Sequence, residues 1–259
     1  MDLQLKDKTA LVTGATAGIG LEIARRLSTE GADVIICGRS QTKLDAAIAD
    51  IGPSVRAVLA DPSTAEGAES LIEAVPDVDI LVNNLGIYES KPFAEITDDD
   101  WRRFFEINVL SGARLSRHYF PRMLTRDWGR VIFIASESGL MVPPDMIHYG
   151  MTKTAQLAIS RGMAALTKGT RVTVNTVLPG TTRSDGIIDF LKSVATDPNA
   201  APETIEAEFF ERDRPTSLIQ RMIEPEEIAS LVAYVASPLS AATNGAALRA
   251  DGGITPTII

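Results

Sequence analysis

Apolar residues follow two alternating patterns along the chain. Short runs rich in β-branched residues, such as "TALVTG" and "DVIICG", are separated by longer segments such as "IGLEIARRLSTEG", in which apolar residues recur every three or four positions. The first pattern predicts strands and the second predicts amphipathic helices. Strands and helices that alternate in this way are typical of parallel βαβ units.

The alternation continues almost to the end of the chain. Further strands are predicted in "VRAVLAD", "DILVNN", "GRVIFIAS", "TRVTVNTVLPG" and "GAALRADGG". A long helix is predicted from about Asp98 to Leu124, and another opens near His148. Because the strand runs are apolar throughout, helices should cover both faces of the sheet. The sequence predicts a Rossmann-type, doubly wound α/β fold with a seven-stranded parallel sheet, in a single domain over residues 1–259.

One interval, residues 184–224, breaks this rhythm. It is too long for an ordinary connection between a strand and a helix, and it carries scattered apolar residues. Insertions at the carboxyl ends of parallel strands often cover a binding site. We expect a substrate lid here, and a mobile surface pair of helices is the alternative.

Composition narrows the range of partners. The chain has 34 acidic and 25 basic residues, a formal net charge of -9, and so lacks a broad cationic surface for nucleic acid. No apolar run approaches the roughly 18 residues of a membrane span, and the N-terminal segment lacks the features of a signal peptide. We expect a cytoplasmic protein that acts on a small molecule. The single cysteine, Cys37, lies in an apolar run and is expected to be a packed strand residue.

The first predicted strand runs into a glycine-rich turn, "TGATAGIG", and a helix follows at once. Backbone amides and the positive end of a helix would meet there, which suits a phosphate group. Gly14 permits the turn, Gly18 lets a pyrophosphate approach the backbone, and Gly20 lets the helix pack closely on the strand. Taken alone, the motif also fits a purely structural turn.

Other motifs stand in a fixed order along the predicted sheet. They are "NNLG" from Asn83 to Gly86, Asn108 in "INVLSG", a serine after the fifth strand, "YGMTK" from Tyr149, "PG" at Pro179, and "DGG" near the end. With the glycine turn, they make the chain from Lys6 to Gly253 resemble the single-domain branch of the short-chain dehydrogenase/reductase family. It is similar there to the 3-oxoacyl-acyl-carrier-protein reductases. The resemblance implies an oxidoreductase that interconverts a carbonyl and a secondary alcohol by hydride transfer with a nicotinamide cofactor.

The resemblance also implies a set of cofactor contacts in the glycine turn and at the carboxyl ends of the strands. They are Gly14, Thr16, Gly18, Ile19, Gly20, Arg39, Asp61, Asn83, Gly86, Tyr149, Lys153 and Thr182. Ser184 is a possible additional contact beside Thr182, although both residues also fit ordinary turn chemistry. The chain departs from the family at Leu85, where alanine is usual, and at Pro62, where an aliphatic residue is usual.

The end of the second strand predicts the choice of cofactor. A carboxylate there would bind the ribose 2′-hydroxyl of NAD and would repel the 2′-phosphate of NADP. Gly38 takes the acidic position and Arg39 follows it. We predict NADP, with Arg39 as the partner of the phosphate, over NAD. An NAD-preferring dehydrogenase of the same family is the alternative.

Tyr149 and Lys153 are predicted to form a proton relay. They are four residues apart, so they share one face of a helix, and the ammonium is expected to lower the pKa of the phenol from its usual value of about 10. His148 lies about 100° around the helix from Tyr149, and we expect it to line the pocket or to form a local hydrogen bond.

A serine and an asparagine complete the predicted relay. Ser136 directly follows the fifth strand, and we prefer it to Ser138 as the hydroxyl that binds the substrate oxygen. The resemblance implies that Asn108 holds a water connecting Lys153 to solvent. No cluster of residues has metal-ligand spacing, so no metal is predicted.

Two rival functions stay open. A sugar-nucleotide epimerase or dehydratase would need a second domain that 259 residues hardly accommodate, and a non-catalytic nucleotide-binding module fits the fold equally well. The family commonly forms tetramers, so a homotetramer or homodimer is expected. The substrate pocket is expected between Leu140 and His148 and near Tyr88. Its apolar lining is predicted from Met141, Val142, Met146, Ile147, Ile187 and Phe190.

Overall fold

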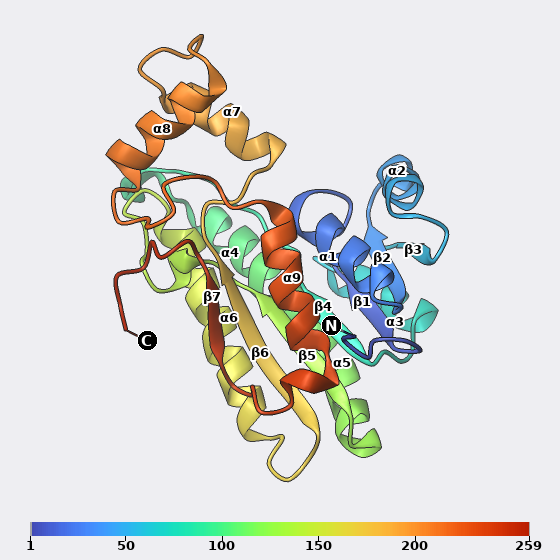
Figure 1. The fold of residues 1–259 in the computed structure, drawn as a ribbon. Helices are drawn as coiled ribbons and strands as arrows, with labels where there is room; N and C mark the ends of the chain where they lie inside the picture. The colour runs from blue at the N-terminus through green and yellow to red at the C-terminus, as the bar shows by residue number, and fades with distance from the viewer. Residues whose placement is uncertain (1, 259) are drawn as a thin grey trace.

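A seven-stranded parallel sheet forms the centre of the computed structural model, which describes residues 2–258 (Figure 1). The strands are β1 (Thr9–Val12), β2 (Asp33–Gly38), β3 (Val55–Leu59), β4 (Ile80–Asn83), β5 (Gly129–Ile134), β6 (Val172–Pro179) and β7 (Ala247–Ala250). Their order across the sheet is β3-β2-β1-β4-β5-β6-β7. All seven predicted strands, and the doubly wound α/β fold, are confirmed.

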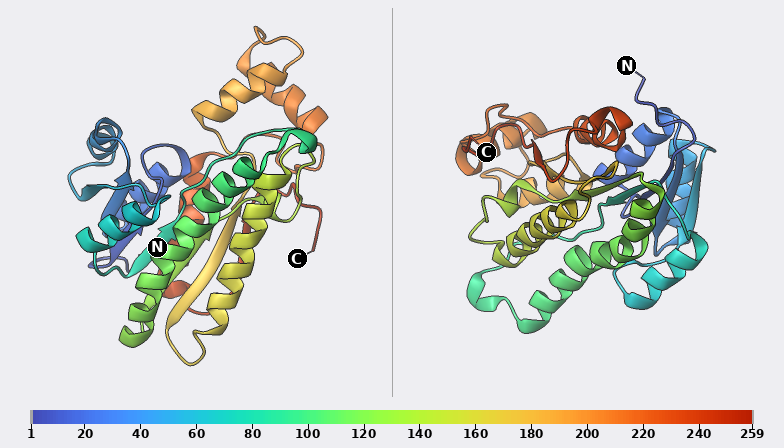
Figure 2. Two further views of the ribbon diagram at one scale, coloured as in Figure 1. Left: turned by 180° about the vertical axis from the view of Figure 1, so that it is seen from behind. Right: turned by 90° about the horizontal axis from the view of Figure 1, so that it is seen from below.

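Helices cover both faces of this sheet (Figure 2). One face carries α1 (Gly18–Thr29), α2 (Gln41–Ile51) and α9 (Pro225–Ala236), and the other carries α3 (Ala65–Ala74), α5 (Ser111–Arg126) and α6 (Ile147–Ala165). Successive side chains of a strand point to opposite faces, so Val12 packs in the first layer and Leu11 in the second. The central strands β4, β5 and β6 are therefore buried at every position, and most of their residues are apolar, as the sequence pattern indicated.

The long helix before β5 is interrupted by one wider turn. Helix α4 (Asp98–Phe105) begins at a capping box of Thr97 and Asp100, and a π-helical turn, Glu106–Leu110, joins it to α5. The sequence predicts a single helix from about Asp98 to Leu124, and the chain does run helically from Asp98 to Arg126. The π-helical turn was not predicted. It carries Asn108, and such turns are frequent at functional sites.

The insertion after β6 forms two further helices, α7 (Asp185–Val194) and α8 (Pro202–Asp213). They stand beyond the carboxyl ends of the strands, at the top of Figure 1. A small apolar cluster of their own, which includes Leu191, Ile205 and Phe209, holds them together. Arg183 links them to the body of the protein through ion pairs with Glu206 and Glu224.

Two further sequence expectations concern the interior and the membrane. Cys37 is 1% exposed, and burial raises the pKa of its thiol to about 12, so the predicted packing role is confirmed. No helix within residues 2–258 has the length and apolar character to cross a bilayer.

Candidate functional site

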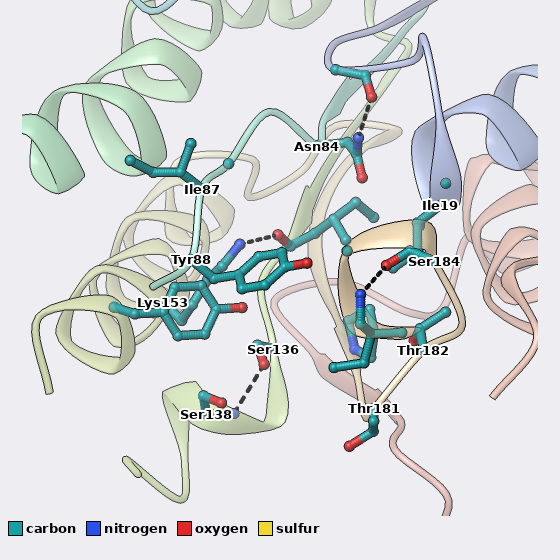
Figure 3. Close-up of a pocket in the computed structure, with 18 of the residues that line it drawn as sticks. Ile19, Asn84, Ile87, Tyr88, Ser136, Ser138, Lys153, Thr181, Thr182 and Ser184 are labelled. Atoms are coloured by element: carbon teal, nitrogen blue, oxygen red, sulfur yellow. Dashed lines mark hydrogen bonds between the residues drawn. The ribbon is translucent and has the colours of Figure 1, made fainter. Parts of the chain in front are cut away.

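A cleft of about 2120 Å³ opens at the carboxyl ends of the strands. Its walls come from the glycine turn before α1, the segments that follow β2, β4, β5 and β6, and helix α7. Figure 3 shows Ser136, Lys153 and Tyr88 gathered around one space, with Thr182 and Ser184 on the side of α7. The carboxyl edge is where ligands bind in sheets of this topology.

The glycine turn has the conformation that its sequence requires. Gly14 and Gly18 have φ values of +62° and +55°, in the left-handed region that glycine tolerates best. A Cβ on Gly20 would lie 2.4 Å from the carbonyl oxygen of Gly14, so only glycine lets α1 approach this closely. Space remains open above Gly18, and Ala17 supplies no side-chain cap to α1. The first amides of α1 are thus available to an anionic group.

Asn84 fixes the glycine turn against β4, a role that was not predicted. Its Nδ2 donates to the carbonyl oxygens of Thr13 and Gly14 at 3.0 and 3.1 Å, and its backbone amide donates to Thr13 Oγ1 (Figure 3). The predicted contact, Asn83, points instead into the protein. It is 3% exposed, lies outside the cleft lining, and donates to Ser116 Oγ. The cause is the alternation of side chains at the end of β4, which turns one asparagine toward α5 and the next toward the cleft.

The end of β2 presents cations to the cleft. Arg39 is exposed and lines it together with Ser40 and Lys43. Within residues 2–258, Arg39 has neither a side-chain hydrogen bond nor an ion pair, so its guanidinium remains available to a ligand. Ser40 caps α2 by accepting a hydrogen bond from the amide of Lys43. The presence of Lys43 in the cleft lining was not predicted. Lys43 is the third residue of α2, which begins directly after the cap residue Ser40.

Ser136, Tyr149 and Lys153 come together in the cleft as the sequence predicted. Ser136 lies just beyond β5, and Tyr149 and Lys153 project from the first turns of α6. Lys153 Nζ lies 5.6 Å from the centre of the Tyr149 ring and donates to the carbonyl oxygen of Ile134 at 3.0 Å. The backbone amide of Ser138 donates to Ser136 Oγ, and Ser138 itself lines the cleft.

The electrostatics of this group differ from the expectation. Burial raises the pKa of Tyr149 and the carboxylate of Glu137 raises it further, whereas the neighbouring Ser136 side chain lowers it. Burial also lowers the pKa of Lys153 to about 8. The predicted lowering of the tyrosine pKa by Lys153 is therefore not seen in the protein alone, because both groups lose their contact with water.

Glu137 places a carboxylate beside these residues, and sequence reasoning did not identify it. Its Oε2 accepts a hydrogen bond from Ser136 Oγ at 2.5 Å, and the residue lines the cleft. Burial raises the pKa of Glu137, while the Ser136 hydrogen bond and the charge of Arg214 lower it. The sequence does contain a signal for this carboxylate: an acidic residue directly follows Ser136, just beyond the carboxyl end of the predicted strand.

Asn108 lies behind the cleft and does not line it. It is 1% exposed, and its side chain holds the loop after β4: Oδ1 accepts from the amide of Ile87 at 2.8 Å, and Nδ2 donates to the Ile87 carbonyl and to Thr152 Oγ1. Its own carbonyl accepts from Gln156 at 2.6 Å. These contacts tie the π-helical turn to α6 and to the segment that carries Tyr88. The water that it is expected to hold remains a prediction.

The remaining predicted cofactor contacts lie along the cleft wall. Thr16, Ile19, Asp61, Gly86 and Thr182 all line it. Thr182 Oγ1 donates to the carbonyl oxygen of Gly180, and Ser184 caps α7 by accepting from the amide of Ile187. Both residues therefore serve local turn chemistry, and they also face the cleft.

The predicted substrate lining is correct in part. Met141, Val142, Met146, Ile187 and Phe190 line the cleft, as does Tyr88, whose ring meets that of Tyr149 edge to face at 6.5 Å. Leu140 and Ile147 lie outside the lining.

The expectation for His148 is wrong. The residue is fully buried, its ring lies 4.1 Å from that of Phe104, and neither ring nitrogen has a hydrogen-bond partner among residues 2–258. Its turn around α6 points it into the core instead of the cleft. Across the same residues, no group of His, Cys, Asp and Glu side chains could hold a metal ion.

Comparisons with known proteins agree with this geometry. A family model described as short chain dehydrogenase matches residues 8–192. The chain is 51% identical to the uncharacterized oxidoreductase YvaG of Bacillus subtilis, across 100% of both chains, and 31% identical to the 3-oxoacyl-acyl-carrier-protein reductase FabG of Vibrio cholerae, across 97% of this chain and 99% of that one. It is also similar to the crystal structure of L-sorbose reductase from Gluconobacter frateurii complexed with NADPH and L-sorbose. That comparison has a TM-score of 0.92 and 28% identity, and it covers 100% of both chains.

Proposed function

Because the chain belongs to the short-chain dehydrogenase family of oxidoreductases, we propose that it interconverts a carbonyl and a secondary alcohol with NADP as its cofactor. The observation that carries the proposal is the meeting of Ser136, Tyr149 and Lys153 in one cleft with the glycine turn. A non-catalytic nucleotide-binding module would have no need to gather these three side chains there. The cofactor is NADPH when the carbonyl is reduced and NADP when the alcohol is oxidised.

The residues around the cleft fit a dinucleotide. The open space above Gly18 and the uncapped amides of α1 suit the pyrophosphate. Gly86 and Thr182 line the part of the cleft that the nicotinamide would occupy. Arg39 and Lys43 suit a 2′-phosphate, which supports NADP over NAD. When bound, NADPH supplies the hydride. The NADPH complex of the similar L-sorbose reductase supports the same choice.

Tyr149 is the proposed general acid in reduction. Its raised pKa keeps the phenol protonated at neutral pH, so it has a proton to give to the substrate oxygen as negative charge develops there. Ser136 hydrogen-bonds the same oxygen, and the ammonium of Lys153 stabilises the phenolate that remains. In oxidation the tyrosine takes the proton back, helped by the positive charge of the oxidised nicotinamide ring.

Several expectations stay predictions alongside this function. Helices α7 and α8 stand over the cleft and suit the predicted substrate lid, since Ile187 and Phe190 of α7 face it. Lys153 is expected to reach solvent through the water predicted at Asn108. A homotetramer or homodimer is also expected from the family resemblance, and a cytoplasmic location is expected because the sequence has no long apolar run.

The test is NADPH oxidation with a panel of ketones, thioesters and polyol-derived carbonyls, using the wild-type protein and Tyr149→Phe. We expect turnover by the wild type and a loss of about 10²- to 10⁴-fold in the variant, because proton transfer contributes that much. The variant should still bind NADPH. Full turnover by Tyr149→Phe would contradict the proposed role of the tyrosine, and NADPH binding without turnover of any carbonyl would favour the binding module.

A further inference from the structure

The carboxylate of Glu137 lies next to the position of the reacting oxygen. Glu137 opens the short 3-10 turn Glu137–Gly139, directly after Ser136, and its Oε2 is 2.5 Å from Ser136 Oγ. It lines the same cleft as Tyr149 and Lys153. A charged group so close to the reacting atoms has to be accommodated by any substrate that binds there.

The hydrogen bond between these two residues conflicts with the proposed reaction. The Ser136 hydroxyl has one proton, and while it donates to Glu137 it cannot donate to a substrate oxygen. When the hydroxyl turns to the substrate, the carboxylate loses this donor inside a partly buried cleft. Hydrogen bonds with the backbone of Glu137 and Ser138 still lower the pKa of this carboxylate, but the loss of one donor inside the cleft is costly.

Neighbouring cations do not replace the lost donor. Lys153 Nζ donates to the carbonyl oxygen of Ile134, and Arg214 lies over the Phe209 ring with its Nη1 donating to the backbone carbonyl oxygen of Asp213. Both charges influence Glu137 through space. The replacement donor can therefore come from the substrate, and its place is set by geometry. Because Glu137 Oε2 lies 2.5 Å from Ser136 Oγ, a donor on the carbon next to the carbonyl can reach Glu137 while the carbonyl oxygen contacts Ser136.

We propose that Glu137 is a specificity-determining residue that accepts a hydrogen bond from a hydroxyl group on the carbon adjacent to the reacting carbonyl. The substrates are then α-hydroxy ketones in reduction and vicinal diols in oxidation. This inference rests on the proposed function. A 3-oxoacyl thioester is disfavoured because its adjacent carbon carries no donor, and a carboxylate or phosphate at that carbon is repelled by the negative charge.

The test compares two ketones of nearly equal shape, 2-hydroxyacetophenone and propiophenone, which differ by a hydroxyl in place of a methyl group. With NADPH, we expect wild-type kcat/KM to favour the hydroxy ketone by about tenfold or more, and Glu137→Leu to lower that ratio by about 10- to 100-fold. Glu137→Gln keeps the shape and a neutral acceptor, so its ratio should fall between the two. Glu69→Gln, on the exposed surface of α3, should leave the ratio unchanged.

The outcomes separate this inference from the function on which it rests. NADPH affinity measured by fluorescence shows that each variant is folded, and a lower ratio in both Glu137 variants supports the inference. An unchanged ratio in the variants, or a wild type that prefers propiophenone, overturns it. Reduction of an acetoacetyl thioester with turnover of neither ketone also overturns it and leaves the proposed function standing. No NADPH turnover with any carbonyl overturns the proposed function itself.

Discussion

Burial makes Lys153 the residue whose charge should limit activity at high pH. Its pKa is lowered to about 8, whereas burial holds that of Tyr149 above its usual value. In the proposed mechanism, reduction requires a protonated Tyr149 and a charged Lys153. The tyrosine keeps its proton throughout the neutral range, so the loss of the lysine charge comes first as pH rises.

We therefore expect kcat/KM for reduction to be high below pH 8 and to fall as pH rises through about 8. Because Glu137 raises the pKa of Lys153, Glu137→Gln should move this fall to lower pH. Rates measured with NADPH from pH 6 to 10 check both statements. Glu69→Gln serves as the control, and a flat profile up to pH 10 would contradict the assignment to Lys153.

Arg39 should distinguish the two nicotinamide cofactors. Arg39→Ala is expected to weaken NADPH binding about 10- to 100-fold, because a charge-assisted contact to the 2′-phosphate is lost, and to leave NADH binding unchanged. Titrating each cofactor by fluorescence measures this. Arg56→Ala, an exposed arginine on the neighbouring strand β3, is the matched control. If Arg39→Ala weakens the binding of NADPH and NADH equally, Arg39 does not recognise the 2′-phosphate.

The chemistry-bearing residues differed in how far the sequence could place them. Tyr149 and Lys153 were predictable because their spacing on one helix fixes their relation, and Ser136 because it ends a strand. Glu137 and Asn84 were missed because each follows a recognised residue, and adjacency in sequence does not say which neighbour turns toward a cleft. His148 was misplaced for the same reason, since the helix starts at Ile147 and points it into the core.

Elements were easier to predict than their exact geometry. Continuous apolar runs identify buried strands, and all seven are present. The π-helical turn at Glu106–Leu110 has no such signal, because it depends on tertiary contacts of Asn108 with Ile87 and Thr152. The same limit applies to α7 and α8: scattered apolar residues predicted an insertion, but the pairing of the helices follows from a small separate core.

Alanine substitutions at Gly18 and Gly20, in the turn between β1 and α1, should have different effects on stability. Gly20→Ala places a Cβ 2.4 Å from both the Gly14 carbonyl oxygen and Asn84 Nδ2, so we expect a loss of about 1–3 kcal/mol of stability together with weaker NADPH binding. Gly18→Ala meets open space but has a φ of +55°, so its stability loss should be smaller, about 1 kcal/mol. Its methyl group should nevertheless obstruct the proposed pyrophosphate position and weaken NADPH binding.

Urea unfolding and NADPH titration measure these effects. Gly162→Ala is the control, because Gly162 lies inside α6 with no atom near its Cβ position, and the exchange should stabilise the protein by about 0.5–1 kcal/mol. If Gly20→Ala binds NADPH with normal affinity, the turn can change its conformation without disturbing the cofactor site.

At the scale of the whole molecule, the cleft is lined by two parts of the chain that have separate hydrophobic cores. The sheet and its two helical layers form the large core, and α7 and α8 pack around a small one of their own. Arg183 joins the parts, since it follows β6 and pairs with Glu206 of α8 and with Glu224 at the start of α9. A helical pair held by its own small core and by partly exposed ion pairs can open locally while the sheet stays folded.

Arg183→Gln should release this pair without unfolding the protein. Partly exposed ion pairs contribute only about 0–1 kcal/mol, so the unfolding midpoint should hardly change. Amide exchange should nevertheless rise in α7 and α8 and stay slow in β5, and KM for the carbonyl should rise about fivefold with NADPH affinity unchanged. Arg126→Gln, which breaks a comparable pair with Asp77 outside the cleft lining, should alter neither exchange in α7 and α8 nor KM. If Arg183→Gln leaves exchange and KM unchanged, the apolar contacts alone hold the two helices over the cleft, and the ion pairs have no part in closing it.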